Sequence, residues 1–132
     1  MSSVRLDNRV VFGILPGPMH ELAIAQSALQ QVLREAERAG ASRVTRIVLR
    51  IGALSGVETE ALRCAFDALL PTSPAAGARL ELQAVAALAR CRGCGHDFEP
   101  VTGTLFECPR CRAFGAELRQ GREMDLVSID CT

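Results

Sequence analysis

The sequence predicts an α+β fold, in which a lobe of two helices and roughly three strands carries a small inserted second lobe. Two observations predict this class. Two amphipathic helical patterns are interleaved with about three strand patterns, which is typical of a small α+β layer. Two closely spaced cysteine pairs lie in a stretch with few large aliphatic residues. With 132 residues in all, the chain has room for one domain or two very small ones.

The composition excludes several classes of protein. Hydrophobic residues make up 48% of the chain and charged residues 23%, so it is neither disordered nor collagen-like. Fifteen basic residues, all arginine, balance fifteen acidic ones, and there is no Trp or Tyr. Such a chain lacks the basic field and the stacking surfaces of nucleic-acid-binding proteins. Apolar runs such as 84–89 are far shorter than the ~20 residues that span a bilayer. We therefore expect neither nucleic acid nor a membrane as a partner.

The first 18 residues lack sustained periodicity and end in a Pro-Gly-Pro breaker at 16–18. We expect residues 1–18 to form an irregular N-terminal extension. The apolar patch at 10–15 is shorter than the apolar region of a secretory signal peptide and lacks a small-residue cleavage site. We therefore expect a cytoplasmic protein, in which cysteine thiols stay reduced.

The first helix and the first strand have clear patterns. In residues 21–39, apolar side chains recur every three or four positions, which predicts an amphipathic helix. Gly40 suits the left-handed position that ends such a helix. Residues 43–51 are rich in β-branched residues and alternate, with Ile47 and Leu49 on one face and arginines on the other. This alternation predicts a half-buried strand.

A second helix is expected to run to about Leu70, where Pro71 prevents its continuation. Ser55 and Glu58 before it fit a capping box, in which the serine oxygen accepts from a free backbone amide and the glutamate reaches back. A second strand is expected at 78–88.

A third strand, shorter and weaker, is expected at 124–131. The stretch before it cannot build a core from apolar area alone, so something else must stabilise it. These patterns divide the chain into three parts: the extension 1–18, an α+β domain of 19–88 plus 117–132, and a ribbon domain of 89–116.

Four cysteines form two C-x-x-C pairs separated by thirteen residues: Cys91, Cys94, Cys108 and Cys111. Two such turns can close a tetrahedron around one Zn²⁺, and metal binding would supply most of this domain's folding free energy. All four positions are used, so no open site is left for a reactive water and the zinc is expected to be structural. The alternatives are a pair of disulfides or an iron site of the same geometry.

Neighbouring residues bear on this site. Gly95 lets the chain turn after the first pair, whereas Arg112 stands at the equivalent position after the second. We expect that second turn to be made at a cost or in another conformation. Arg90, Arg92, Arg110 and Arg112 each adjoin a cysteine and could offset the formal charge of minus two on a four-thiolate zinc site.

Two further cysteines and a histidine that could bind a metal lie outside the pairs. Cys64 sits in the second helical pattern, and we expect it to be a small buried hydrophobe. Cys131 lies near the end of the sequence, and we expect it to have no role. His96 follows the first pair, and a solvated loop histidine is favoured there over an extra ligand.

The segment Met19-His20-Glu21 opens the first helix. By sequence physics alone, His20 is a surface histidine and Glu21 favours the positive end of the helix dipole. A zinc-protease helix is excluded because Ile24 stands where the second histidine is needed. No nucleophile elbow, P-loop or dinucleotide fingerprint occurs, so we expect no enzyme.

From Met19 onward, the sequence resembles the HypA/HybF family of hydrogenase nickel-incorporation proteins. The motifs that carry the resemblance are specific in combination: residues 19–30, 43–56, 60–66 and 121–124 with both C-x-x-C pairs. The resemblance implies a nickel metallochaperone that passes Ni²⁺ towards the large subunit of [NiFe]-hydrogenase with a maturation GTPase. It also implies particular ligands, with His20 binding nickel, Glu21 as its neighbour or tuning group, and the four cysteines holding structural zinc. Self-association stays open, as does urease as a client.

The physical chemistry of the nickel motif predicts a weak site. Ni²⁺ favours square-planar nitrogen ligands, and a cation at a helix N-terminus meets an unfavourable dipole. We therefore expect a pH-sensitive site that can transfer its metal. The family motif normally starts the chain, so that the amino group can join the metal, whereas eighteen residues precede Met19 here. We expect Met19 to be the native start.

Two other functions are consistent with the residues. One is a zinc-ribbon protein-interaction module without nickel binding, in which His20 is merely exposed. The other is a redox protein with iron or a reactive dithiol in the cysteine pairs.

Overall fold

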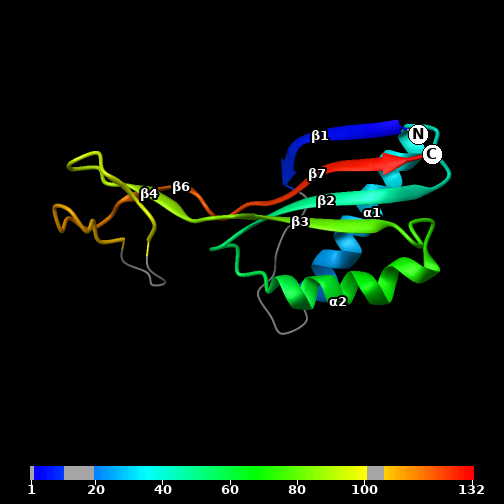
Figure 1. The fold of residues 1–132 in the computed structure, drawn as a ribbon, viewed down its shortest axis with the longest axis horizontal. Coiled ribbons are helices and arrows are strands. Elements are labelled where there is room, and N and C mark those ends of the chain that lie inside the picture. Colours follow the sequence, from blue (N-terminus) through cyan, green and yellow to red (C-terminus); the bar gives the residue numbers. More distant parts are fainter. Residues whose placement is uncertain (1, 11–19, 101–105) are drawn as a thin grey trace.

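The computed structural model describes residues 2–10, 20–100 and 106–132, which form a larger and a smaller lobe joined by a narrow neck (Figure 1). The α+β class is confirmed. The elements in chain order are β1 (Ser2–Val10), α1 (His20–Arg38), β2 (Val44–Gly52), α2 (Thr59–Leu69), the 3-10 turn η1 (Leu70–Thr72), β3 (Arg79–Val85), β4 (Leu88–Arg90), β5 (Asp97–Phe98), β6 (Glu117–Gln120) and β7 (Met124–Cys131).

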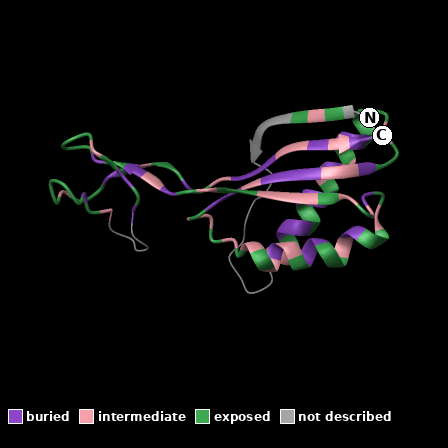
Figure 2. Ribbon diagram, in the orientation of Figure 1, coloured by how far each residue is buried: buried purple, intermediate pink, exposed green. Residues whose placement is uncertain are grey.

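The larger lobe is a four-stranded sheet with both helices packed on one face (Figure 1). Its strand order is β1-β7-β2-β3, in which β2 and β3 are parallel and the other pairs antiparallel. α2 forms the crossover that a parallel pair requires. The core lies between helices and sheet, and its largest fully buried side chains include Phe66 and Leu62 of α2, Ile47 and Leu49 of β2, and Leu126 of β7 (Figure 2).

Both helices lie where the patterns predict, but the start of α2 differs. α1 ends at Arg38, and Gly40 takes the left-handed conformation with φ of 72°. Ser55 does not cap α2, because its Oγ accepts from the amide of Val57 in a turn and Gly56 has φ of 82°. The capping-box prediction is therefore wrong. Glu58 is the N-cap, and its Oε1 accepts from the amide of Glu60 at 3.2 Å.

The prediction of an irregular extension is wrong for residues 2–10. These residues form β1, which pairs with β7 at the edge of the sheet (Figure 1). The ladder runs from Ser2 opposite Cys131 to Val10 opposite Asp125, and its register shifts between Arg5 and Arg9. This irregularity breaks the two-residue alternation by which a strand is recognised in a sequence. Residues 11–18 of the predicted extension lie outside the described residues.

The predicted strand 78–88 is divided between the two lobes. β3 ends at Val85 and pairs with β2, whereas β4 begins at Leu88 and belongs to a second sheet of order β5-β4-β6. Because β6 pairs with β4, residues 117–120 also belong to this sheet, and the predicted ribbon boundary at 116 is corrected to 120. The larger lobe therefore has four strands, one more than expected, and the ribbon domain is slightly longer than predicted.

The smaller lobe has a core that consists partly of cysteine. Its buried cluster contains Ala89, Cys91, Phe98, Cys108 and Ala116. Four of these five side chains are alanine or cysteine, so the apolar area available is small. The stability of this lobe therefore depends on whatever the cysteines hold.

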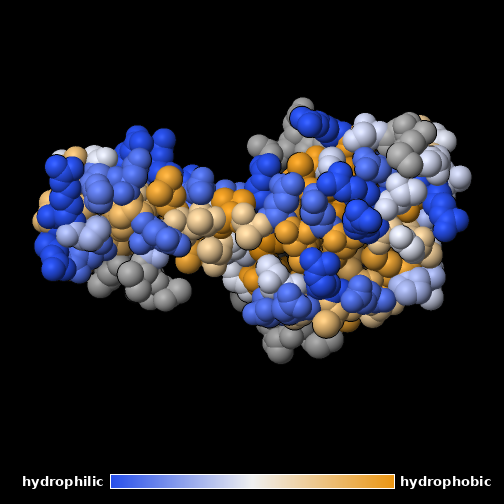
Figure 3. Space-filling model, viewed as in Figure 1, coloured by the Kyte–Doolittle hydropathy of each residue, from blue (hydrophilic) through white to orange (hydrophobic). Residues whose placement is uncertain are grey.

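The neck is a close crossing of backbone segments. A Cβ atom at Gly52 would collide with the carbonyl group of Gly121, and one at Gly121 would lie 2.8 Å from the Cα of Ala87. Hydrogen bonds close the crossing, from the amide of Leu54 to the Gly121 carbonyl at 2.6 Å and from the amide of Gly52 to the Glu123 carbonyl at 2.8 Å. The space-filling view shows the constriction between the two lobes (Figure 3). No helix within the described ranges is long and apolar enough to cross a membrane.

Candidate metal centre

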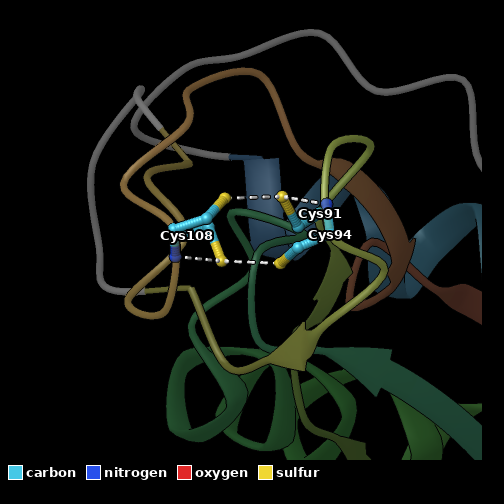
Figure 4. A group of neighbouring side chains, drawn as sticks. Cys91, Cys94 and Cys108 are labelled. Carbon is cyan, nitrogen blue, oxygen red and sulfur yellow. Dashed lines mark hydrogen bonds between the residues drawn. The ribbon is translucent and has the colours of Figure 1, made fainter.

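The two C-x-x-C turns face each other (Figure 4), at the end of the smaller lobe that lies away from the neck (Figure 1). The four Sγ atoms of Cys91, Cys94, Cys108 and Cys111 all lie within 4.8 Å of one another. The Sγ of Cys91 lies 3.4 Å from that of Cys111, and the Sγ of Cys94 lies 3.7 Å from that of Cys108. A tetrahedron with Zn–S bonds of ~2.3 Å has S–S edges of ~3.8 Å. The four sulfurs therefore fit a single tetrahedral ion.

Backbone amides point at one sulfur in each turn. The amides of Gly93 and Cys94 donate to the Sγ of Cys91 at 3.3 and 3.4 Å. In the second turn, the amides of Arg110 and Cys111 donate to the Sγ of Cys108 at 3.4 and 3.5 Å. These donors favour the thiolate form that a metal ion requires. The C-x-x-C spacing itself positions these amide donors.

The two turns also close with the same hydrogen bonds. The amide of Gly95 donates to the carbonyl of Cys91, and the amide of Arg112 donates to that of Cys108, both at 2.9 Å. Gly95 has φ of 75° and Arg112 has φ of 66°. The second turn thus has the same conformation as the first, and not another one. This conformation has a steric cost at Arg112, because a side chain is disfavoured in the left-handed region.

The pKa values of the cysteines differ according to their hydrogen bonds. The pKa of Cys91 is lowered to about 6, chiefly by the amide of Cys94 and against the opposing effect of burial. Burial acts to raise the pKa of Cys108, but the amides of Cys111 and Arg110 outweigh it, and the net shift is downward. For Cys111, a backbone hydrogen bond with Ala113 lowers the pKa, yet the neighbouring thiols and burial together raise it to about 11. One thiolate in each turn is thus favoured before a metal binds.

Among the described residues, the arginines beside the cysteines pair with carboxylates or are exposed, and their offset of the thiolate charge stays a prediction. Arg90 forms a two-pronged ion pair with Asp97, at 2.7 and 3.2 Å, which lowers the pKa of that carboxyl. Arg112 lies 3.4 Å from Glu107. Arg92 and Arg110 are exposed, and neither forms an ion pair within the part of the chain that the structure describes. The direct contacts to the sulfurs therefore come from backbone amides.

The centre has a buried side and a solvent side. Cys91 and Cys108 are 3% and 0% exposed, whereas Cys94 and Cys111 are exposed. Each turn thus contributes one sulfur to the lobe's core and one to its surface. An ion bound here would link the segment that follows β4, with Cys91 and Cys94, to the segment that precedes β6, with Cys108 and Cys111. Among the described residues, no other group of three or more metal-ligating side chains comes together.

Cys64 and Cys131 differ from expectation, whereas His96 lies outside the four-sulfur group, as expected. Cys64 is exposed on α2, so the prediction that it is buried is wrong. Cys131, expected to have no role, is fully buried in the core as the last residue of β7. The ring of His96 stacks on that of Phe98 at 6.4 Å, and its carbonyl accepts from the amide of Cys91 at 2.9 Å. His96 therefore supports the first turn through its backbone and lies outside the four-sulfur group.

The predicted nickel motif lies at the start of α1. His20 is the first residue of this helix, and Glu21 is half-buried in its first turn. Met19 and the side chain of His20 lie outside what the structure describes. Both α1 and α2 begin at the end of the larger lobe that faces the neck (Figure 1). The motif and the cysteine centre are thus on separate lobes, with the neck between them.

One protein family matches this chain. Its sequence profile, described as "Hydrogenase/urease nickel incorporation, metallochaperone, hypA", matches residues 19–131. The hydrogenase maturation factor HypA of Chlorobaculum parvum is 40% identical over 111 residues, which are 84% of this chain and 97% of the relative. The HypA of Dehalococcoides mccartyi strain 195 is 38% identical over 112 residues, with 85% and 93% covered.

Two solved structures share the fold. The solution structure of the Ni metallochaperone HypA from Helicobacter pylori superposes with a TM-score of 0.60 at 24% identity and covers 84% of this chain and 96% of its own. A second solution structure of a HypA protein gives a TM-score of 0.64 at 26% identity and covers 88% and 98%. Both matches include nearly the whole of the compared chain, so the two-lobed arrangement is common to them.

Proposed function

Because this chain belongs to the HypA family of hydrogenase and urease nickel-incorporation proteins, we propose that it is a nickel metallochaperone in the maturation of [NiFe]-hydrogenase. In this proposal, the chain catalyses no reaction. It binds Ni²⁺ on the larger lobe and passes it on through contacts with the hydrogenase large subunit and a maturation GTPase. The observation that carries the proposal is the family match over residues 19–131, which includes both the histidine motif and the four-sulfur group.

The cysteine centre is proposed to hold a structural Zn²⁺. The sulfur–sulfur distances, the amide donors and the absence of a fifth ligand among the described residues of the four-sulfur group support a closed tetrahedral site. Zinc bound by Cys91, Cys94, Cys108 and Cys111 would hold the smaller lobe together and neutralise part of the thiolate charge. The residues of the chain supply all four ligands, so no position is left for a reactive water.

Nickel is the cargo in this proposal, and His20 is its proposed imidazole ligand. Support comes from its place as the first residue of α1, where free backbone amides are close by in the chain. Imidazole and backbone nitrogen together provide the ligand type that Ni²⁺ prefers. The positive end of the helix dipole opposes a bound cation, which is consistent with a site that releases its metal. Glu21, in the same turn, is proposed to offset that unfavourable charge.

Two histidines in the sequence allow a matched test. His20→Ala is expected to weaken Ni²⁺ binding at least tenfold by isothermal titration, while His96→Ala binds nickel as the unaltered chain does. All three proteins should contain one zinc and no iron by elemental analysis. An unchanged nickel isotherm for folded His20→Ala would rule out this ligand. Iron in the purified protein, or no metal in the cysteine centre, would instead support the redox alternative.

One observation favours a second candidate function, a zinc-ribbon protein-interaction module. Phe114, directly after the second cysteine turn, is 64% exposed and is the one large hydrophobic side chain exposed among the described residues. An exposed aromatic ring beside a rigid metal centre suits a protein contact. The nickel titration separates the two candidates, because an interaction module needs no stoichiometric nickel.

A further inference from the structure

β3 is an edge strand of the larger sheet, and no strand among the described residues pairs with its outer side. The sheet order is β1-β7-β2-β3, so β2 covers one side of β3 only (Figure 1). The amide of Ala53, just after β2, donates to the carbonyl of Val85, which therefore points towards β2. Because the polar groups of successive residues in a strand point to opposite sides, those of Leu80, Leu82 and Ala84 point outwards.

Side chains cap both ends of this outer edge. The Nη1 atom of Arg63, on α2, donates to the carbonyl of Leu80 at 3.4 Å. The Nε2 atom of Gln120 donates to the carbonyl of Ala86, just beyond the end of β3, at 3.0 Å. Between these two caps, the outward amides and carbonyls in 82–84 have no hydrogen-bond partner within the described part of the chain. The edge is therefore open in the middle only.

The open stretch has none of the features that usually protect an edge strand. Such edges pair with extended segments of other chains unless charge, proline or a covering element prevents it. The two charged residues of β3, Arg79 and Glu81, come before the stretch, and β3 has no proline. Gln83 and Ala84 are exposed, and Leu82 is half-buried. The unpaired polar groups of this stretch are thus accessible to an added strand.

A cavity of about 190 Å³ lies beside the open stretch, between β3 and the start of α2. Its lining consists of Ile51 of β2, residues 82–84 of β3, and Thr59, Glu60 and Arg63 of α2. Side chains of a strand alternate between the two faces of a sheet. A strand added to β3 would therefore direct every second side chain towards the helices, and one of these would enter the cavity.

The charges of the cavity wall favour a basic side chain. α2 begins at the end of the larger lobe where β3 ends, so Glu60 lies towards Ala84 and Arg63 lies further along the groove (Figure 1). The guanidinium of Arg63 already donates to a carbonyl of β3. The carboxylate of Glu60 is exposed and forms no ion pair with any residue that the structure describes. A lysine or arginine can lay its aliphatic stem on the apolar part of the lining and hold its charge near Glu60.

A second copy of the chain fits this edge poorly. In each copy α2 lies alongside β3, since Arg63 reaches the outer carbonyl of Leu80. Two paired β3 strands would lie about 4.8 Å apart, whereas two packed helices need roughly 8–10 Å between their axes. The two α2 helices would therefore collide or force the strands apart. An extended segment brings no helix with it and avoids this conflict.

We propose that the outer edge of β3 is a docking site for an extended, basic segment of a partner protein. The segment adds a strand beside 82–84 by main-chain hydrogen bonds and places one lysine or arginine side chain in the cavity near Glu60. This inference goes beyond the nickel and zinc proposals and is independent of them, because it involves neither His20 nor the four cysteines.

The test uses the full chain and two fluorescein-labelled peptides with blocked ends, of sequence TVTKTVT and TVTETVT. In both, the central residue and the two valines share one face of an extended strand. Fluorescence anisotropy is expected to show one-to-one binding of the lysine peptide, at least threefold tighter than that of the glutamate peptide. No saturable binding of the lysine peptide would overturn the docking site, and equal binding of the two peptides would overturn its preference for a basic segment.

Ala84→Pro removes one outward amide from the edge and places a proline ring there. The bonds of β3 to β2 should remain, because proline is tolerated in an edge strand where its nitrogen faces solvent. This variant is expected to bind the lysine peptide at least tenfold more weakly than the unaltered chain. Ala84→Ser is the matched control, since it keeps the amide and nearly the same size, and it should bind as the unaltered chain does. Equal binding by folded Ala84→Pro would overturn the proposal.

Glu60→Gln tests the charge and also decides the proposal if Ala84→Pro does not fold, because Glu60 is exposed. It should bind the lysine peptide about threefold more weakly and the glutamate peptide no more weakly. Glu37→Gln, at an exposed position near the other end of the larger lobe, should change neither. Equal effects of the two glutamine variants would overturn the role of Glu60. Circular dichroism and zinc content verify that each variant is folded. A dimer of the unaltered chain in light scattering that Ala84→Pro abolishes would show that a second copy, and not a basic segment, occupies the edge.

Discussion

Arg112 stands in the second cysteine turn where Gly95 stands in the first, and both residues have a left-handed backbone, with φ of 66° and 75°. Each donates its amide to the carbonyl of the first cysteine of its turn at 2.9 Å. The hydrogen-bond pattern of the turn is thus strong enough to impose on an arginine a conformation that suits glycine. The other interactions of the cysteine centre must therefore offset the steric cost of the left-handed backbone at Arg112.

Arg112→Gly is therefore expected to stabilise the metal-bound ribbon by about 1 kcal/mol, since glycine removes a steric cost of this size but adds some backbone entropy to the unfolded chain. Competition with a chelator should show zinc held about fivefold more tightly. The lost contact with Glu107 is exposed and contributes little. Arg110→Gly is the control, because Arg110 has no positive φ, and it should bring no gain. A weaker hold on zinc in Arg112→Gly would contradict this explanation of the turn.

Removal of zinc is expected to unfold the smaller lobe and to leave the larger lobe folded. The buried cluster of the smaller lobe includes two of the ligand cysteines themselves, whereas the core between the sheet and the two helices contains none of the four. Metal binding supplies roughly 10–16 kcal/mol in small zinc peptides. Hydrogen exchange with and without a chelator should show fast exchange in 88–120 only. Loss of protection throughout α1 and α2 would show that the two lobes fold as one unit.

Asp125→Asn is expected to stabilise the protein at neutral pH and not in acid. Burial raises the pKa of Asp125, an effect that Arg50 opposes and Glu123 reinforces. A carboxyl group with a raised pKa binds its proton more tightly in the folded protein than in the unfolded one. The protonated group therefore stabilises the fold fully at pH values below its pKa in the unfolded protein. This stabilisation is lost as the pH rises through its pKa in the folded protein. At pH 7, the ionised, buried carboxylate thus lowers stability. Urea unfolding at pH 7 and at pH 3 measures the difference.

Asp130→Asn is the control for this prediction. Asp130 lies 3.7 Å from Arg46, so its replacement removes a favourable ion pair and should give no gain at pH 7. Equal effects of the two substitutions would mean that the burial of Asp125 does not determine its effect on stability.

Gly52→Ala is expected to destabilise the neck by about 3 kcal/mol, at the upper end of what an overpacked site costs. The added methyl group would collide with the backbone of Gly121, which cannot move aside as a side chain can. Gly77→Ala provides the comparison, because Gly77 has φ of 80° but nothing within 4 Å of an added Cβ. It should lose only about 1–2 kcal/mol through backbone strain. Thermal unfolding of both variants checks the ranking, and similar losses would argue against a tight crossing.

Local patterns predicted the elements whose partners are near in the sequence. The periodicity of α1, the alternation of β2 and the spacing of the four cysteines each depend on neighbours within a few residues, and all three agree with the structure. The start of α2 was wrong because the left-handed Gly56 separates Ser55 from the helix. A rare backbone conformation inside a motif is not evident from residue types alone.

The strands that depend on distant partners were predicted less well. β7 lies in the centre of the sheet, yet its pattern is weak because a register shift opposite Val48 and Leu49 moves its core-facing positions from Leu126 to Ile129. β1 escaped detection because only pairing with β7 makes it a strand. For the nickel motif, the helix position of His20 agrees with the sequence, and its metal ligation stays a prediction.

The position of β7 also governs the order of assembly during translation. The strand that joins β1 to β2 is synthesised after the whole cysteine lobe. Until then, the first strand has no neighbour to pair with, and the nascent chain holds an incomplete sheet. β1 and β2 therefore become part of one sheet only after β7 has been made.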